Sequence, residues 1–259
     1  MTNLILVGII LYNMEPTTAA TDVLELFAGD VAPPAHQWAD PYPNRLAKYE
    51  VWHGPMQKLC ERFDANLFDA IITDPPYARK HWPLYQYLLD EADRILKPGG
   101  YLLMIVPHIM LDPSKQSLTI KDGSTMRFRW PLMMDQQTGN HARLCNAKRN
   151  IRCTYKMIGW WIKEPAVRDY SEVVDSFQND PPKKKFSWEQ SPSWAQYCLG
   201  MLKPYSFVLD PMAGHGVLPV EAIRMGHRVV ACELDKDRAD ETARRVWQVL
   251  GNTPQPTLV

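Results

Sequence analysis

The chain lacks an excess of charge of either sign. Its 259 residues include 29 Lys or Arg and 29 Asp or Glu. Overall charge therefore predicts no particular partner, and local charge has to decide. Hydrophobic residues make up 46% of the chain and charged residues 22%, which is typical of globular proteins. A chain of this length can bury a substantial core, and we expect one large domain.

Paired cysteines are also missing. The five cysteines form no Cys-x-x-Cys pair and have no regular spacing, which argues against a common zinc site and against a disulfide framework. His141, Cys145 and Cys153 come nearest to a metal-binding set, but without a cysteine pair we expect no metal. We expect reduced thiols in a cytoplasmic protein.

The chain has one short apolar run near its start and no long one. Residues 4–12 are apolar, but this stretch is too short to span a bilayer. No Lys or Arg precedes it, unlike in a secretory signal. It is either a strand or an extension ahead of a natural start at Met14, and we expect no membrane association. Residues 15–47 are rich in Pro, Ala and Thr, which predicts an irregular segment.

Residues 68–106 carry the pattern of a strand–helix–strand unit. Residues 68–73 are apolar and β-branched, which favours a buried parallel strand. Residues 82–96 have helical apolar spacing, Lys97-Pro98-Gly99-Gly100 ends that helix, and residues 101–106 form another buried strand. This unit predicts a parallel sheet and an α/β fold. Further strands are predicted at residues 49–54, 155–162, 207–210 and 228–232, and further helices at 56–63, 193–202, 217–225 and 238–250.

The middle of the chain concentrates positive charge. Residues 115–163 hold ten Lys or Arg and two Asp or Glu, a net charge of +8. Cations alternate there with aromatic side chains, Phe128 and Trp130, that can stack on bases. A phosphate backbone is the usual reason for such a segment. The alternative is a solvated loop whose charge balances acidic helices. The cations predicted to contact nucleic acid are Arg127, Arg129, Lys148, Arg149 and Arg152.

A glycine-containing turn follows the strand predicted at residues 207–210. Gly214 and Gly216 let the backbone turn tightly and approach a ligand without an intervening Cβ. The next strand ends at Glu233, whose carboxylate can accept hydrogen bonds from both hydroxyls of a ribose. Turn and acid together favour a cofactor that contains adenosine. A glycine pair alone is weak evidence, and a surface glutamate at a strand end is the alternative.

The tetrapeptide Asp74-Pro75-Pro76-Tyr77 follows the strand predicted at residues 68–73. Consecutive prolines donate no backbone hydrogen bonds and stiffen the turn, so carbonyl oxygens face outward beside the Asp74 carboxylate. These oxygens can accept both N–H bonds of an amino group. Tyr77 offers a flat face for stacking a base withdrawn from its helix. The alternative is a rigid turn with a capping aspartate.

Together these motifs resemble those of S-adenosylmethionine-dependent DNA amino-methyltransferases, the family that modifies the exocyclic amine of adenine or cytosine. The tetrapeptide matches the family's catalytic motif, which implies a catalytic role for Asp74, Pro75, Pro76 and Tyr77. Leu96 to Gly100 resemble the stretch that follows this motif. The resemblance implies cofactor contacts for Asp210, Pro211, Met212, Ala213, Gly214, Gly216 and the ribose-binding acid Glu233, and for Trp188 and Glu189 in a segment before the glycine turn.

The order of the motifs resembles that of the family's beta class, with the catalytic motif first, a basic region next and the cofactor loop last. This order implies a circularly permuted, Rossmann-like methyltransferase fold with a mostly parallel sheet and helices on both faces. RNA guanine and protein glutamine methyltransferases with related Pro-Pro-Tyr motifs place the cofactor loop first. Residues 23–30 resemble such an upstream loop but lack a second glycine. Met212, His215 and Val217 depart from the Phe, Ser and Thr of the family's loop.

The resemblance implies a site-specific enzyme that methylates the N6 amine of adenine in DNA, because cytosine enzymes often carry Ser in place of Asp74. Cytosine N4 methylation and a non-catalytic nucleic-acid-binding protein that retains the fold are the alternatives. We expect a catalytic domain at residues 48–259, with the basic DNA-recognition region inserted within residues 108–185. The expected partner is double-stranded DNA, in restriction-modification or phage modification. A homodimer and a cognate restriction nuclease stay open.

Overall fold

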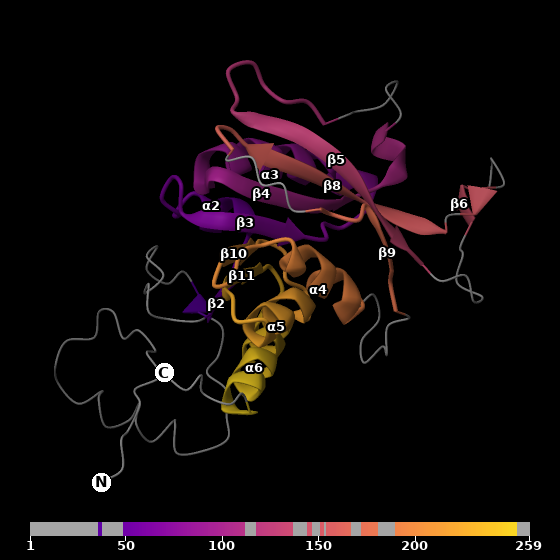
Figure 1. Ribbon diagram of the computed structural model, residues 1–259. Coiled ribbons are helices and arrows are strands. Elements are labelled where there is room, and N and C mark those ends of the chain that lie inside the picture. Colours follow the sequence, from indigo (N-terminus) through magenta and orange to yellow (C-terminus); the bar gives the residue numbers. More distant parts are fainter. Residues whose placement is uncertain are drawn as a thin grey trace, which may run out of the picture.

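The structure is a computed structural model that describes residues 36–37, 49–111, 118–136, 144–146, 151–152, 154–166, 172–180 and 190–252. Within these residues nine strands form one sheet in the order β1-β2-β11-β10-β3-β4-β8-β5-β9 (Figure 1). Its neighbouring strands are parallel except for the pairs β4–β8 and β5–β8. The strands of this sheet are β1 (His36–Gln37), β2 (Tyr49–His53), β3 (Phe68–Thr73), β4 (Leu96–Val106), β5 (Met126–Asp135), β8 (Tyr155–Lys163), β9 (Ser176–Gln178), β10 (Phe207–Asp210) and β11 (Arg228–Glu233).

The described helices are of two kinds. The α-helices are α2 (Met56–Cys60), α3 (Trp82–Ile95), α4 (Pro192–Gly200), α5 (Val217–Arg224) and α6 (Lys236–Asn252), and the short 3-10 helices are η1 (Arg79–His81) and η2 (His108–Leu111). Two more strands, β6 (Leu144–Asn146) and β7 (Ile151–Arg152), pair with each other. None of the described helices is long and apolar enough to cross a membrane.

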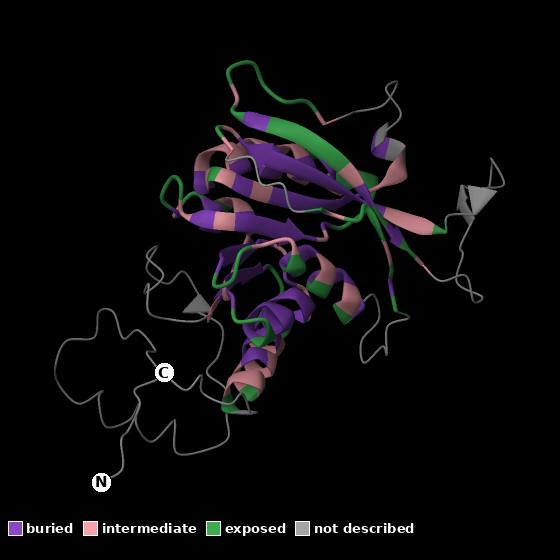
Figure 2. Cartoon of the chain, viewed as in Figure 1, coloured by how far each residue is buried: buried purple, intermediate pink, exposed green. Residues whose placement is uncertain are grey.

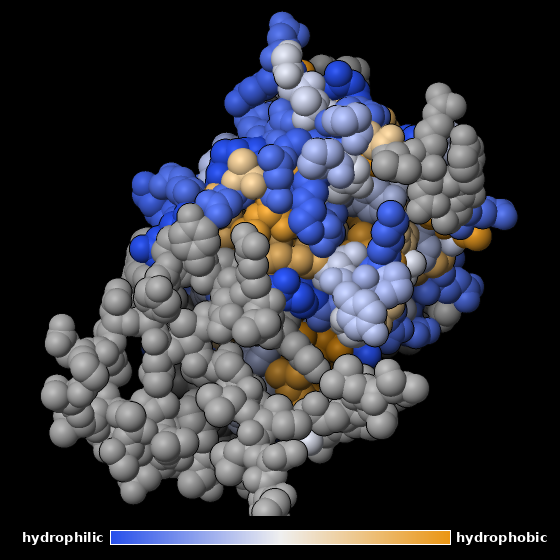
Figure 3. All heavy atoms as spheres, turned by 60° about the vertical axis from the view of Figure 1, so that its left-hand side comes forward, coloured by the Kyte–Doolittle hydropathy of each residue, from blue (hydrophilic) through white to orange (hydrophobic). Residues whose placement is uncertain are grey.

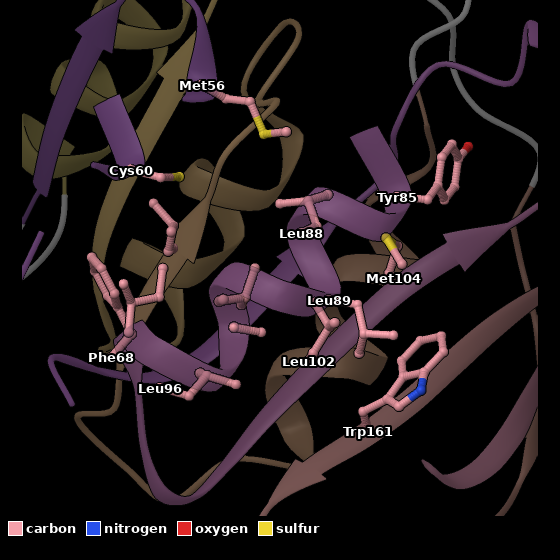
Figure 4. Packing of buried hydrophobic residues seen from close by; sticks show 14 of the residues in the cluster. Met56, Cys60, Phe68, Tyr85, Leu88, Leu89, Leu96, Leu102, Met104 and Trp161 are labelled. Carbon is pink, nitrogen blue, oxygen red and sulfur yellow. The ribbon is translucent and has the colours of Figure 1, made fainter. Parts of the chain in front are cut away.

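Neighbouring residues of β4 point to opposite faces of the sheet, and different helices cover each face. Leu102 belongs to a hydrophobic cluster with Leu88 and Leu89 of α3, which Figure 4 shows. The next residue, Leu103, belongs to a second cluster with Trp194 of α4 and with residues of α5. Among the residues that Figure 3 colours, most on this face are hydrophilic, and the hydrophobic ones gather in patches near its middle. The expected sheet with helices on both faces is therefore confirmed.

Most predicted elements lie at or within a few residues of their predicted bounds. Strands β3 and β10 have the predicted bounds. Strand β4 is longer than predicted and begins at Leu96, which pairs with Phe68 of β3. The Pro-Gly-Gly stretch was expected to separate helix and strand, but it lies within β4 as an irregularity between the Leu96–Phe68 and Tyr101–Ala70 pairs, where Gly99 has a φ of 81°. A Cβ at Gly100 would lie 2.9 Å from the carbonyl oxygen of Lys97, so this path of the chain requires glycine.

Strand β5 is absent from the sequence predictions, although it pairs with β8 along its whole length. Two features hide it. Pro131 lies in its middle, and proline in a central strand argues against that assignment. The four residues from Arg127 to Trp130 are all exposed, and a register shift between Phe128 and Trp130 breaks the alternation of buried and exposed side chains. Figure 2 shows this exposed half of the strand.

The order of strands changes direction between β10 and β3. From β10 the chain passes through α5 to β11 on one side, and from β3 it passes through α3 to β4 on the other side. The two strands are parallel neighbours, with Leu209 opposite Ile71. Ligands of open α/β sheets bind at the carboxyl ends of the strands at such a switch point. The turns after β3 and β10, which carry the two sequence motifs, lie side by side there.

Candidate active site

The turn after β3 brings Asp74 into contact with residues from distant parts of the chain. The Asp74 carboxylate accepts a hydrogen bond from the Tyr77 hydroxyl at 2.5 Å. Its other oxygen accepts one from the Nε2 of Gln190, which precedes α4. Asp74 is half-buried, whereas Tyr77 is 39% exposed. Both carboxylate oxygens therefore have donors, and one side of the tyrosine stays accessible.

Lys156 of β8 completes this set of contacts. Its Nζ donates to the Tyr77 hydroxyl at 3.0 Å and to the Oε1 of Gln190 at 3.0 Å. It also lies 5.2 Å from the centre of the Tyr77 ring. We call Asp74, Tyr77, Gln190 and Lys156 the amine-site network. The sequence motifs pointed to the first two members. Gln190 belongs to the segment before the glycine turn that was expected to contact the cofactor, and Lys156 was not predicted.

Burial and the other members of the network shift the pKa of Asp74 in opposite directions. Burial raises the pKa of Asp74, while the Lys156 charge and the hydrogen bonds from Tyr77 and Gln190 lower that pKa. Burial and the Asp74 carboxylate raise the pKa of Tyr77 well above its usual value. The tyrosine therefore keeps its proton at neutral pH and acts as a donor to Asp74.

The carbonyl oxygens of the two prolines were expected to face outward, but both lie within reach of a buried hydroxyl group and Pro75 is itself buried. The hydroxyl of Tyr85, a fully buried residue of α3, donates to the Pro75 carbonyl at 3.0 Å and lies 3.5 Å from the Pro76 carbonyl. A carbonyl oxygen has two lone pairs, so the Pro75 oxygen retains one for a further donor. Tyr85 of α3 thus fixes the orientation of the turn. The sequence motif does not reveal this hydrogen bond.

The turn after β10 places its two glycines in different surroundings. Gly214 and Gly216 have φ values of 56° and 81°, which other residues rarely adopt. A Cβ at Gly216 would lie 2.8 Å from the side chain of Thr242 in α6, so packing requires glycine there. A Cβ at Gly214 would meet nothing within 4 Å. Gly214 therefore borders open space in which a ligand can approach the backbone.

Glu233 at the end of β11 is tied to the same turn. Its Oε2 accepts from the Gly214 N–H at 2.8 Å, and its Oε1 accepts from the Asp235 N–H at 2.9 Å. The residue is 8% exposed. These bonds fix the carboxylate beside the turn, and each oxygen keeps a lone pair for a ligand hydroxyl.

Asp210, the last residue of β10, is buried next to two other acids. Its pKa is raised to about 8, mainly by burial and to a lesser extent by the Glu233 and Asp74 charges, while a hydrogen bond from the Met212 N–H at 3.3 Å acts in the opposite direction. A raised pKa favours the protonated form of this side chain at neutral pH. Pro211 and Ala213 are buried as well, and Met212 is half-buried. The turn is held from within, and Gly214 is its open part.

Two of the predicted nucleic-acid contacts, Arg127 and Arg129, lie away from this site. Lys156 pairs with Met134 of β5, so Arg127 and Arg129 lie on the order of 20 Å away along the strand, at about 3.3 Å per residue. Arg127 donates to the carbonyl oxygens of Ser124 and Met126. Trp188, Glu189, Lys148, Arg149, His141 and Cys153 lie outside the described residues, as do the side chains of Cys145 and Arg152.

No known protein-family profile matches the chain, and no curated protein matches its sequence. Solved structures do match its fold. The M1.HpyAVI–SAM complex is 18% identical, with a TM-score of 0.60 over 76% of this chain and 99% of the other. The cytosine-N4-specific PvuII DNA methyltransferase is 12% identical, with a TM-score of 0.61 over 77% and 86%.

A third structure is a putative DNA modification methylase from Thermus thermophilus in complex with S-adenosyl-L-methionine. It is 19% identical, with a TM-score of 0.56 over 78% of this chain and 95% of the other. At such identities the likeness shows the fold alone. The expected Rossmann-like methyltransferase fold is confirmed.

Proposed function

We propose that this chain is an S-adenosylmethionine-dependent DNA methyltransferase that modifies the exocyclic amine of a base. One observation carries this proposal: the turn with Asp74 and Tyr77 and the turn with Gly214 follow neighbouring parallel strands at the switch point of the sheet. An amine acceptor and a turn suited to a nucleoside thereby lie at the same edge of the sheet. Solved structures with the same fold include the SAM complex of M1.HpyAVI and a cytosine-N4-specific DNA methyltransferase, which supports the proposal.

The turn after β10 suits an adenosine-containing cofactor. The open space beside Gly214 admits a ligand close to the backbone, and the Glu233 carboxylate next to it can accept ribose hydroxyls. The raised pKa of Asp210 favours its neutral form at pH 7, so we expect this residue to add little electrostatic attraction for a cationic cofactor. S-adenosylmethionine, when bound, supplies a methyl group on a positively charged sulfur.

The amine-site network suits the other reactant. The Asp74 carboxylate accepts a hydrogen bond from one N–H of the amino group, and the remaining lone pair of the Pro75 carbonyl oxygen accepts one from the other N–H. These bonds favour a pyramidal nitrogen and stabilise the positive charge that develops on it. Tyr77 stacks on the base with its exposed face. The protein's remaining contribution to the rate of methyl transfer is to align the two reactants, because no covalent enzyme intermediate is needed.

We propose adenine N6 as the target amine, on the family resemblance of an Asp at the first motif position. Cytosine N4 is the second candidate, since the cytosine-N4-specific PvuII enzyme has the same fold. The two amines make the same hydrogen bonds to Asp74, so the geometry of the network suits either one.

A methyl-transfer assay tests the proposal. The purified chain is incubated with radiolabelled S-adenosylmethionine and, separately, double-stranded DNA, single-stranded DNA and RNA. We expect label in DNA, and nucleoside mass spectrometry then distinguishes N6-methyladenine from N4-methylcytosine. The Asp74→Ala variant should lose at least about 100-fold in rate, the scale for removing one stabilising group of an active site, while it still binds the cofactor. The matched control is Asp122→Ala at an exposed position. Wild-type rates from Asp74→Ala would refute the assignment.

A further inference from the structure

Lys156 lies outside every sequence motif, yet it contacts two members of the amine-site network at once. It is 79 positions from Tyr77 and 34 from Gln190 along the chain. Strand β8 holds it in place, because the residues that follow it, such as Ile158 and Trp160, are buried in the core. A side chain on so rigid a strand is placed more reproducibly than one on a loop.

The two bonds from Lys156 determine which way its partners donate. A lysine ammonium is a donor only. Gln190 must therefore turn its carbonyl oxygen to Lys156, which directs its NH₂ group to Asp74. If this amide were reversed, two donors would face each other at Lys156 and two acceptors at Asp74. The same logic holds for Tyr77, whose oxygen accepts from Lys156 and whose proton then points to Asp74.

We propose that Lys156 is a positioning residue of the amine site, which directs the donors of Tyr77 and Gln190 toward the Asp74 carboxylate and so fixes that carboxylate for the incoming amine. This inference rests on the proposed function. It adds a residue from a distant strand, β8, to a site that the motif locates only in the turn after β3. Lys156 acts through its two partners and does not touch the reacting atoms.

The charge of Lys156 has a second consequence for Asp74. Among the described residues, the titratable groups that face Asp74 are Tyr77 of its own turn, Tyr85 of α3, Asp210 of β10 and Lys156 of β8. Among them Lys156 lowers the pKa of Asp74, against the burial that raises it. An amine-accepting aspartate has to be ionised. Loss of the lysine charge should therefore move the acid limb of the methyl-transfer rate to higher pH.

The experiment compares Lys156→Met with Lys156→Arg, which keeps a cationic donor. Single-turnover methyl transfer is measured across the pH range. We expect Lys156→Met to lose about 100-fold in rate, the scale for displacing a reacting group by about 1 Å. The midpoint of the acid limb in its pH–rate profile should move to higher pH by about one unit. The Lys156→Arg variant should keep the wild-type midpoint. Cofactor affinity should be unchanged in both. Lys121→Met is the control, since Lys121 forms an exposed ion pair with Asp90.

A readout without catalysis separates this inference from the proposed function. The Asp74 carboxyl is titrated by ¹³C NMR in protein labelled at aspartate and is assigned with Asp74→Asn. A higher midpoint in Lys156→Met supports the inference, and Lys156→Gln replaces that variant if it does not fold. Identical midpoints in wild type and Lys156→Met would overturn it. A wild-type protein that methylates no nucleic acid would refute the proposed function instead, whatever the midpoints are.

Discussion

The backbone N–H of Gly214 donates to the Oε2 of Glu233 at 2.8 Å, which links the open glycine of one strand-to-helix turn to the acid at the end of the neighbouring strand. Ala213 N–H also donates to the Cys232 carbonyl at 2.9 Å. The turn and the end of β11 are thus one unit. A ligand that binds one of them contacts a surface whose shape the other maintains.

Replacing Glu233 with Ala should weaken both folding and cofactor binding. The N–H groups of Gly214 and Asp235 lose their acceptor, which should lower the free energy of unfolding by about 1–3 kcal/mol. Glu233→Gln keeps an acceptor oxygen but loses the negative charge. Its free energy of unfolding should therefore exceed that of Glu233→Ala, while its affinity for the cofactor should be about 10-fold lower than that of the wild type. Urea unfolding and calorimetry with S-adenosylmethionine measure the two effects. The control is Glu61→Ala, whose ion pair with Lys58 is exposed. Unchanged cofactor affinity in both Glu233 variants would exclude the residue from the cofactor site.

The two glycines of the turn should separate stability from binding. Both have positive φ, so alanine at either position costs about 1–2 kcal/mol of backbone strain. Gly216→Ala also collides with Thr242, which should add about 1–3 kcal/mol of overpacking. Gly214→Ala meets no neighbour in the protein, so its additional effect should fall on cofactor affinity. The result that contradicts this assignment is a Gly214→Ala variant that binds cofactor as tightly as the wild type.

Asp210 should make stability depend on pH. Its pKa is raised to about 8 in the folded chain, compared with about 4 for an unfolded chain. The folded state therefore holds one more proton than the unfolded state between these values, and the free energy of unfolding falls as pH rises through this window. Asp210→Asn resembles the protonated acid and cannot ionise. Its stability should decline less between pH 5 and 8, as urea unfolding at several pH values will measure. Parallel stability curves for the two proteins would show that Asp210 ionises normally.

The sequence predicted those parts of the molecule that depend on neighbouring residues. Apolar periodicity located β3, α3 and β10, and turn chemistry located the motifs that follow β3 and β10. Strand β5 was missed because Pro131 and the exposed run from Arg127 to Trp130 conceal its pattern. Packing against β8 decides that segment, and no local signal shows this partner.

The contacts that complete the site could not be predicted for a related reason. Gln190 lies 116 positions from Asp74, and Lys156 lies 79 positions from Tyr77. Only the register of β8 and the path into α4 bring them together. The same register separates Arg127 and Arg129 from the site. Charge counting located a basic segment, but it could not tell which end of a strand each cation occupies.

Tyr77 has two contributions that substitution can distinguish. Its exposed ring is proposed to stack on the base. Its hydroxyl accepts a hydrogen bond from Lys156 and donates one to Asp74. Tyr77→Ala loses both, and lost stacking of about 1–3 kcal/mol should raise the KM for DNA by about 10- to 100-fold. Tyr77→Phe keeps the ring and should leave the KM for DNA near the wild-type value. It removes a donor to Asp74, which should lower kcat and shift its acid limb to higher pH. Steady-state kinetics with DNA as the varied substrate measure this split, with Tyr205→Phe as the control at a 79% exposed position. An equal rise in KM for both Tyr77 variants would show that the hydroxyl, rather than the ring, binds the base.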